Sequence, residues 1–269
     1  MLVWLSIALA GAPEPLPSAN AVRGELIAGL GACVACHTAE GSNEIAGGYA
    51  VRTRYGVFYG RNLTPDATGL GDWSYADFVT AMRLGRGADG HALWPAFPYA
   101  SFTGLSDRDL SDLWAWLGTI APVAQEDRPH EIKGAYRGGL GLWRTMAFRP
   151  ARTFDDGLTD DGGAIRDEAV RGRYLVDVLG HCGECHTPRT SVGVPQRQRY
   201  LQGWDDLHAP DISALGWSTS ELASFLGDGI TPDGDVTGGE MNRVIREGTS
   251  RLNDADRRAI AAWITALAD

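Results

Sequence analysis

All four cysteines of the chain belong to two copies of one short pattern. Each copy reads Cys-x-x-Cys-His, and the residues concerned are Cys33, Cys36 and His37 in the first copy and Cys182, Cys185 and His186 in the second. This pattern is the attachment signature of a c-type haem. The two thiols form thioether bonds with one porphyrin, and the histidine becomes the proximal ligand of the iron. The sequence therefore predicts two covalently bound haem c groups.

Other uses of paired cysteines fit this pattern less well. An even number of cysteines in an exported protein often forms disulfides, and a Cys-x-x-Cys pair can be a redox dithiol or half of a zinc site. None of these uses requires a histidine in the next position of both copies. A zinc site would also have to combine two pairs that lie 149 residues apart. Haem attachment is therefore favoured.

The composition is that of an ordinary globular protein, with 44% hydrophobic and 22% charged residues. A length of 269 residues is enough for two modest domains. The net charge of −10 argues against nucleic acid as a partner. The same charge is compatible with docking to a basic or mixed-charge redox protein.

The first residues of the chain are apolar. The apolar run covers 1–12, which is too short to span a membrane comfortably, and a proline-rich spacer follows it to Ser18. This pattern predicts a signal peptide or N-terminal anchor over 1–18, and the alternative is a frayed helix. Covalent haem attachment normally occurs outside the cytoplasm. We therefore expect a periplasmic protein, soluble or peripherally attached to a membrane.

Short motifs recur along the chain at a nearly constant offset. Trp73-Ser74 and Asp89-Gly90 recur 144 residues later as Trp217-Ser218 and Asp233-Gly234, and the haem motifs are 149 residues apart. Such an offset indicates duplication of a unit of about 100 residues. In both copies the order is haem motif, loop, Trp-Ser helix, ligand loop and final helix.

Helix signals dominate both repeats. A serine is followed three residues later by an acid at Ser74, Ser106 and Ser218, which predicts capping boxes. Apolar residues at helical spacing predict final helices that carry Leu110 and Ile260. Helices are also expected to lead into the haem motifs over 22–36 and 168–185, whereas 49–59 is the sole β-like stretch.

These elements predict an all-α protein with two tandem domains. The first cytochrome-like domain is expected over 19–121 and the second over 167–269, and a bridging segment covers 122–166. Glycine and proline interrupt the bridge, which includes a short helix near 143–148. The bridge is too long and too aromatic for a flexible linker, so we expect it to pack across both units.

Several of these motifs resemble those of a known family, the dihaem and trihaem cytochrome c subunits that serve membrane-bound bacterial dehydrogenases for alcohols, gluconate and similar substrates. The resemblance covers roughly 20–268. It rests on GLGACVACHTA (29–39), RNLTPD (61–66), GDWS (71–74), LWPAFPY (93–99) and GEM (239–241). It implies class I cytochrome c folds, His/Met coordination of iron, and a protein that carries electrons while a partner performs the substrate chemistry.

The resemblance implies a sixth ligand for the second haem. Met241 lies in the GEM motif, 55 residues after His186, in what we expect to be the loop before the final helix. A thioether ligand raises the reduction potential, which suits an electron acceptor. The alternative is a methionine that only packs in the core. The scarcity of methionine, with four in the chain, favours the ligand.

The first haem departs from this pattern, because the residue at the equivalent position is Phe97. Phenylalanine cannot bind iron, and three possibilities stay open. His91, six residues earlier, would give a His/His haem and is weakly favoured. Met82 could serve, but it aligns with Leu226 on a helix, so core packing is the better interpretation. The third possibility is an open iron that binds water or small molecules.

A few further residues have expected positions. Arg61, Asn62 and Thr64 are candidates for bonding the haem propionates, since such outer-shell donors tune the potential. His181 precedes the second motif and is expected to point away from the iron, at the surface. No role follows from the sequence for His130.

The sequence thus predicts a periplasmic dihaem cytochrome c that transfers single electrons from a dehydrogenase or quinol-linked donor to a downstream acceptor, such as another cytochrome or an oxidase. The alternative is a dihaem enzyme with an open first haem and peroxidase-type chemistry. Peroxide cleavage needs a distal acid or base near the iron, and His91 would be the candidate. A haem-binding sensor or assembly module ranks last, because the sequence contains no effector segment.

Overall fold

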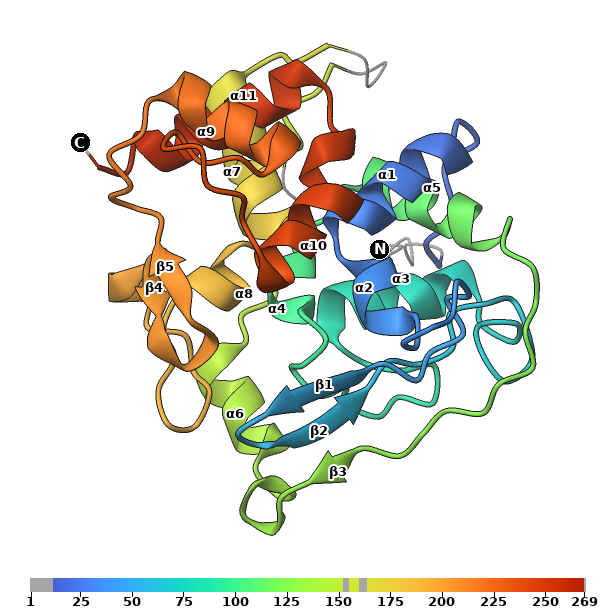
Figure 1. Cartoon of the computed structure of the whole chain (residues 1–269). Coiled ribbons are helices and arrows are strands. Elements are labelled where there is room, and N and C mark those ends of the chain that lie inside the picture. Colours follow the sequence, from blue (N-terminus) through green and yellow to red (C-terminus); the bar gives the residue numbers. More distant parts are fainter. Residues whose placement is uncertain (1–11, 152–154, 160–163, 269) are drawn as a thin grey trace, which may run out of the picture.

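Helices form most of the regular structure. The computed structural model describes residues 12–151, 155–159 and 164–268, so the apolar start at 1–11 lies outside the described residues. The α-helices are α1 (Ala21–Leu30), α2 (Cys33–His37), α3 (Tyr75–Leu84), α4 (Tyr99–Phe102), α5 (Asp107–Leu117), α6 (Leu140–Ala147), α7 (Glu168–Tyr174), α8 (Gly183–His186), α9 (Thr219–Asp228), α10 (Gly239–Glu247) and α11 (Asp254–Thr265) (Figure 1). In the described part of the chain, no helix is long and apolar enough to cross a membrane.

Two small antiparallel sheets accompany the helices, so the protein is mainly helical rather than all-α. The first sheet joins β1 (Ala50–Thr53), β2 (Gly56–Tyr59) and β3 (Glu131–Ile132), and the second joins β4 (Gln202–Trp204) and β5 (Ala209–Asp211). The β-like stretch at 49–59 is thereby confirmed as a hairpin. A prediction from single segments missed β3, because this strand forms only by pairing with β2, far away in the sequence.

The sequence repeat is also a structural repeat. Helix α1 packs against α5 in the first copy, and α7 packs against α11 in the second (Figure 1). Helix α3 likewise contacts α5, as α9 contacts α11. Both Trp-Ser helices end on a left-handed glycine, Gly85 with φ of 58° and Gly229 with φ of 75°.

Helix starts follow the serine signals with one exception. Complete capping boxes join Ser74 to Asp77 and Ser218 to Glu221, as predicted. At the third site Ser106 Oγ accepts from the backbone N–H of Asp109 at 3.1 Å. The second bond of a capping box, from the backbone N–H of Ser106 to the Asp109 carboxylate, is not formed. The fully buried Asp109 carboxylate instead accepts from Tyr174 and Arg23. A contact between the two repeats therefore overrides the local cap.

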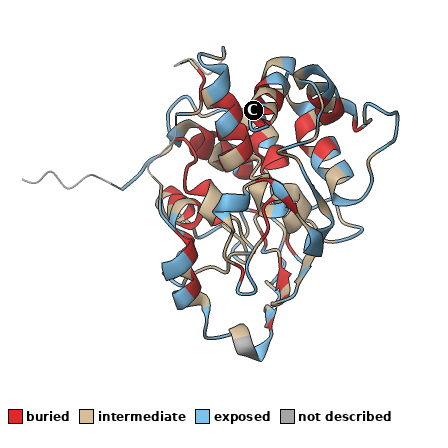
Figure 2. Cartoon of the chain, turned by 90° about the vertical axis from the view of Figure 1, so that its left-hand side faces the viewer, coloured by how far each residue is buried: buried red, intermediate tan, exposed pale blue. Residues whose placement is uncertain are grey.

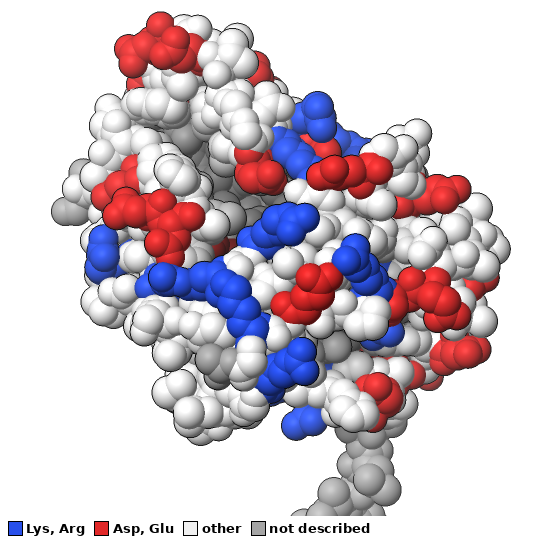
Figure 3. Space-filling view, turned by 60° about the horizontal axis from the view of Figure 1, so that its bottom comes forward, with Lys and Arg blue, Asp and Glu red and all other residues white. Residues whose placement is uncertain are grey.

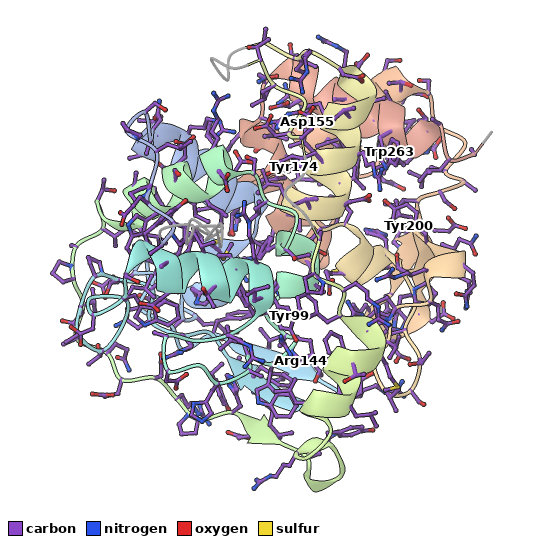
Figure 4. The ribbon with its side chains drawn as sticks, turned by 180° about the vertical axis from the view of Figure 1, so that it is seen from behind. Tyr99, Arg144, Asp155, Tyr174, Tyr200 and Trp263 are labelled. Atoms are coloured by element: carbon purple, nitrogen blue, oxygen red, sulfur yellow. The ribbon has the colours of Figure 1, made fainter. Side chains whose placement is uncertain are left out.

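Both repeats contribute to one large hydrophobic cluster. Buried residues of α1, α3 and α5 pack with those of α7, α9 and α11, and Figure 2 shows them on helix faces that turn inward. Tyr174 of α7, 1% exposed, accepts from the backbone N–H of Ser106 at 3.0 Å at the start of α5. Figure 4 labels Tyr174, whose bond to the start of α5 links the second repeat to the first.

The segment 122–166 contacts both repeats. Trp143 of α6 and Phe148, just after the end of α6, both pack edge-on against the buried Tyr99. The guanidinium of Arg144, also in α6, lies 5.0 Å from the centre of the Tyr99 ring (Figure 4). Further along, the backbone carbonyl of Asp156 accepts from Arg171 Nη1 at 3.1 Å. The segment thus reaches from α4 of the first repeat to α7 of the second.

The helices that lead into the haem motifs are interrupted, which corrects the prediction of continuous helices over 22–36 and 168–185. Helix α1 ends at Leu30, and Ala32 then takes a left-handed backbone with φ of 54° before α2 begins. In the second copy α7 continues as a π-helix to Leu179, and His181 has φ of 39°. A sharp turn directly before the first cysteine is common to both copies and reorients the motif.

Candidate haem-binding sites

The two motif histidines have the same hydrogen-bonding arrangement. His37 Nδ1 lies 2.7 Å from the carbonyl oxygen of Arg61, and His186 Nδ1 lies 2.9 Å from that of Pro210. A carbonyl can only accept, so Nδ1 carries the proton and Nε2 keeps its lone pair. Burial lowers the pKa of both histidines, which favours the neutral imidazole. Both rings are therefore oriented and protonated as iron ligands require.

The surroundings of Cys33 and Cys182 differ from those of a reactive thiolate. All four cysteines are free, so no disulfide competes with haem attachment. Burial raises the pKa of Cys33 and of Cys182 to about 12, which is opposite to the low pKa of a reactive thiolate. Among the described residues, no group of three His, Cys, Asp or Glu side chains could hold a metal ion. These observations disfavour the dithiol and zinc interpretations.

A largely apolar cavity opens beside the first motif. Cys33, Cys36 and His37 line one wall. The remaining walls include aromatic and aliphatic side chains from the first sheet, from α3 and the turn before it, and from α5, among them Phe58, Trp73, Phe78, Met82, Leu113 and Leu117. A flat, apolar cofactor next to a histidine with a free Nε2 matches this lining, so the residues present fit a haem.

The structure does not bring the favoured sixth ligand of the first haem to this cavity. The His91 side chain is 85% exposed, and its Nδ1 lies 3.0 Å from an oxygen of Asp89. The Asp89-Gly90 turn holds the His91 side chain in solvent in this structure, and its role as a ligand stays a prediction. Phe97 does line the cavity, as does Met82 from α3. Met82 is 5% exposed and belongs to the packed core.

The three candidate propionate contacts are already engaged. Asn62 Nδ2 donates to the carbonyl of Val123 at 2.8 Å, and Thr64 Oγ1 accepts from the N–H of the same residue at 3.1 Å. Arg61 supplies its carbonyl to His37, and its side chain pairs with Asp127. Asn62 and Thr64 are buried and hold the bridging segment against the site. Whether these residues also bond the propionates stays a prediction.

Two histidines that the sequence did not place line the first cavity. His130, from the bridging segment, accepts at Nδ1 from the backbone N–H of Tyr59 at 3.2 Å, so its Nε2 carries a proton. His181, expected at the surface, also lines this cavity. No sequence signal marked either one, because both reach the cavity from segments far from the first motif.

The second site is built from α8, the second sheet and α10. Tyr200, from the turn before β4, donates to Asp177, and its ring lies beside Gly183 of the motif. Figure 4 shows Tyr200 and Trp263 on the side of the molecule formed by the second repeat. Met241 is partly buried against the core. It lies in the first turn of α10 rather than in a loop.

The two motifs lie close together. Arg243 of α10 donates from Nη2 to the carbonyl of Ala35 in the first motif at 2.6 Å, across 208 residues of sequence. Burial and then the neighbouring Glu184 and Cys36 raise the pKa of Cys185 to about 11. A β-carbon on Gly180, two residues before Cys182, would lie 3.6 Å from Cδ1 of Leu30, which precedes the first motif.

Comparison with known proteins agrees with this geometry. No protein-family model matches the chain. A dihaem c-type cytochrome of Cereibacter sphaeroides is 37% identical over 278 residues, which cover 97% of this chain and 91% of that protein. The chain therefore belongs to the family of dihaem c-type cytochromes.

Longer proteins also resemble the chain. The cytochrome c subunit of gluconate 2-dehydrogenase from Pantoea cypripedii is 36% identical over 91% of this chain and 59% of its own length. The cytochrome c subunit of the quinone alcohol dehydrogenase from Gluconobacter oxydans is 36% identical over 91% of this chain and 54% of its own length. The chain thus spans little more than half of these subunits.

Proposed function

We propose that this chain is a dihaem electron carrier that binds one haem c at each motif. Cys33 and Cys36 would hold the first haem by thioether bonds, as Cys182 and Cys185 would hold the second. The observation that carries the proposal is the matched pair of histidine bonds, in which each motif histidine is fixed by a carbonyl 24 residues downstream. A bound haem c supplies a one-electron couple between ferric and ferrous iron.

We further infer the organisation and setting of the carrier. The repeats at 19–121 and 167–269 would be two class I cytochrome c domains, with 122–166 as the bridge. The segment 1–18 would act as a signal peptide or anchor. The protein would work in the periplasm, and any contact with the membrane would be peripheral. The support is the haem motif itself, since covalent attachment normally takes place outside the cytoplasm.

The donor is proposed to be a dehydrogenase or quinol-linked complex, and the acceptor another cytochrome or an oxidase. Relatives named as cytochrome subunits of gluconate and alcohol dehydrogenases support this choice. Figure 3 shows basic and acidic side chains interspersed on one face, where a band of Lys and Arg runs between acidic groups. Such a mixed surface suits a small, transient redox contact.

The purified holoprotein tests the proposal directly. We expect two haems per chain that stay attached under denaturing conditions, and full reversible reduction of both. The measurement is a haem count against protein concentration, with absorption and EPR spectra of the oxidised and reduced states. A count of one haem or none would overturn the dihaem assignment.

A second prediction concerns the sixth ligand of the second haem, which we propose to be Met241. Met241→Leu keeps a similar apolar volume but removes the thioether. We expect the second haem to become high-spin and to bind carbon monoxide, as measured by EPR and absorption. Met146→Leu is the control, because Met146 is 46% exposed in α6. Unchanged low-spin signals in Met241→Leu would assign the ligand elsewhere.

One observation favours a second candidate function, peroxidase-type chemistry at an open first iron. Phe97 lines the first cavity at the position where the second site has Met241, so this position offers the first iron no thioether ligand. His91 lies outside the cavity, so the distal acid or base would have to be another lining group, such as His130. Carbon monoxide distinguishes the two functions. One high-spin haem that binds carbon monoxide in the wild type would support the enzyme. Two low-spin haems that do not bind it would support a pure carrier.

A further inference from the structure

A side chain of the second repeat completes the first cavity. His181 directly precedes Cys182, yet its ring lines the cavity that contains Cys33 and His37. The ring packs edge-on against Phe102, with ring centres 5.3 Å apart. Phe102 in turn borders the turn before Cys33, since a β-carbon on Gly31 would lie 3.7 Å from Phe102 Cζ and 3.8 Å from Cys33 Sγ. His181 therefore lies on the thioether side of the first site.

The contacts of His181 define the form of its ring. Nδ1 lies 3.1 Å from the carbonyl oxygen of Leu179, so Nδ1 carries a proton and Nε2 keeps its lone pair. Burial lowers the pKa of His181, which favours the neutral ring. A neutral, flat side chain is thereby fixed within the cavity by a backbone bond.

The backbone at His181 is shared by both repeats, but the side chain is not. His181 has φ of 39° and Ala32, at the same position of the first repeat, has φ of 54°. A non-glycine residue in this region costs about 1 kcal/mol. At this position the first repeat has only the methyl side chain of Ala32, whereas the second has the imidazole of His181, which extends across the contact between the repeats. The asymmetry means that only the second motif adds a ring to its neighbour's site.

The surrounding contacts hold the two motifs against each other. A β-carbon on Gly180 would lie 3.6 Å from Cys182 Sγ and 3.6 Å from Cδ1 of Leu30, the last residue of α1. On the other side of the contact, Arg243 donates to the first motif at Ala35. His181 is thus the side chain that continues from a haem-bearing cysteine of one site into the cavity of the other.

We propose that His181 is a positioning residue for the first haem, which fixes the edge of that haem against the attachment point of the second and so speeds electron exchange between them. This inference rests on the proposed function, namely that both motifs carry haem. The exchange moves one electron from one iron to the other and changes no covalent bond. A packed ring avoids an empty gap between the two sites, and gaps slow electron transfer.

The test is His181→Ala in the full holoprotein, with His91→Ala as the matched control. Alanine should preserve the turn, because Ala32 adopts it in the first repeat. We expect inter-haem electron exchange after flash photoreduction to be slower in His181→Ala than in the wild type, and unchanged in His91→Ala. The reduction potential of the first haem should also shift in His181→Ala. In a redox titration, Met241→Leu identifies which of the two transitions belongs to the second haem.

The outcomes separate this inference from the proposed function. Wild-type protein without two haems would overturn the proposed function itself. Wild-type protein with two haems, and a His181→Ala variant with the same exchange rate and the same potentials, would overturn the role of His181 alone. If His181→Ala does not fold, His181→Asn replaces it, since asparagine tolerates a left-handed backbone.

Discussion

His186→Ala should abolish the low-spin signal of the second haem in the purified protein and leave the signal of the first haem unchanged. The variant removes the ring that the Pro210 carbonyl orients, so the second iron would lose its proximal ligand. The thioether bonds do not require the histidine, and any haem that still attaches should be high-spin. His37→Ala should have the same effect at the first site, where Arg61 provides the carbonyl. Absorption, EPR and a haem count measure both results.

His91→Ala provides the control for this experiment. Its side chain is 85% exposed and pairs with Asp89, so its removal should alter neither haem. A His186→Ala protein that kept two ordinary low-spin haems would contradict the assignment of the proximal ligand. Because the two motifs are tested one at a time, the two variants also attribute each spectral signal to one repeat.

Local patterns in the sequence predicted much of this protein. The haem motifs, the hairpin at 49–59 and the capping boxes at Ser74 and Ser218 each depend on residues close together in the sequence. Such features need no knowledge of the rest of the chain. Each of these elements is found in the structure where its own residues indicate it.

The failures share a different physical origin. Asp109 was expected to complete a capping box, but the buried contact with Tyr174 and Arg23 takes its carboxylate. His181 was expected at the surface, but the packing of the second repeat on the first places it in a cavity. Both depend on contacts between the repeats, which no local pattern contains.

The contact between the first and last helices of each repeat depends on a glycine. A β-carbon at Gly172 in α7 would overlap the backbone carbonyl of Ala259 in α11 and lie 2.9 Å from Cβ of Trp263. Gly24 in α1 meets α5 in the same way, with Trp116 Cβ at 2.7 Å. Backbone atoms cannot move aside as a flexible side chain can. The close crossing, repeated in both copies, therefore excludes every side chain at these positions.

Gly172→Val should consequently be strongly destabilising, because α7 must separate from α11 and open the shared core. Overpacking of this kind costs about 3 kcal/mol, which corresponds to a fall in Tm of roughly 6–12 °C for a chain of this size.

Gly141→Val is the control, because Gly141 is exposed in α6 and nothing lies within 4 Å of its β-position. Gly141→Val should change the free energy of unfolding by no more than about 0.5 kcal/mol. Thermal unfolding of the holoproteins measures both, and equal Tm values for the two variants would contradict the rigid crossing. Gly24→Val should match Gly172→Val, since both copies depend on the same contact between helix backbones.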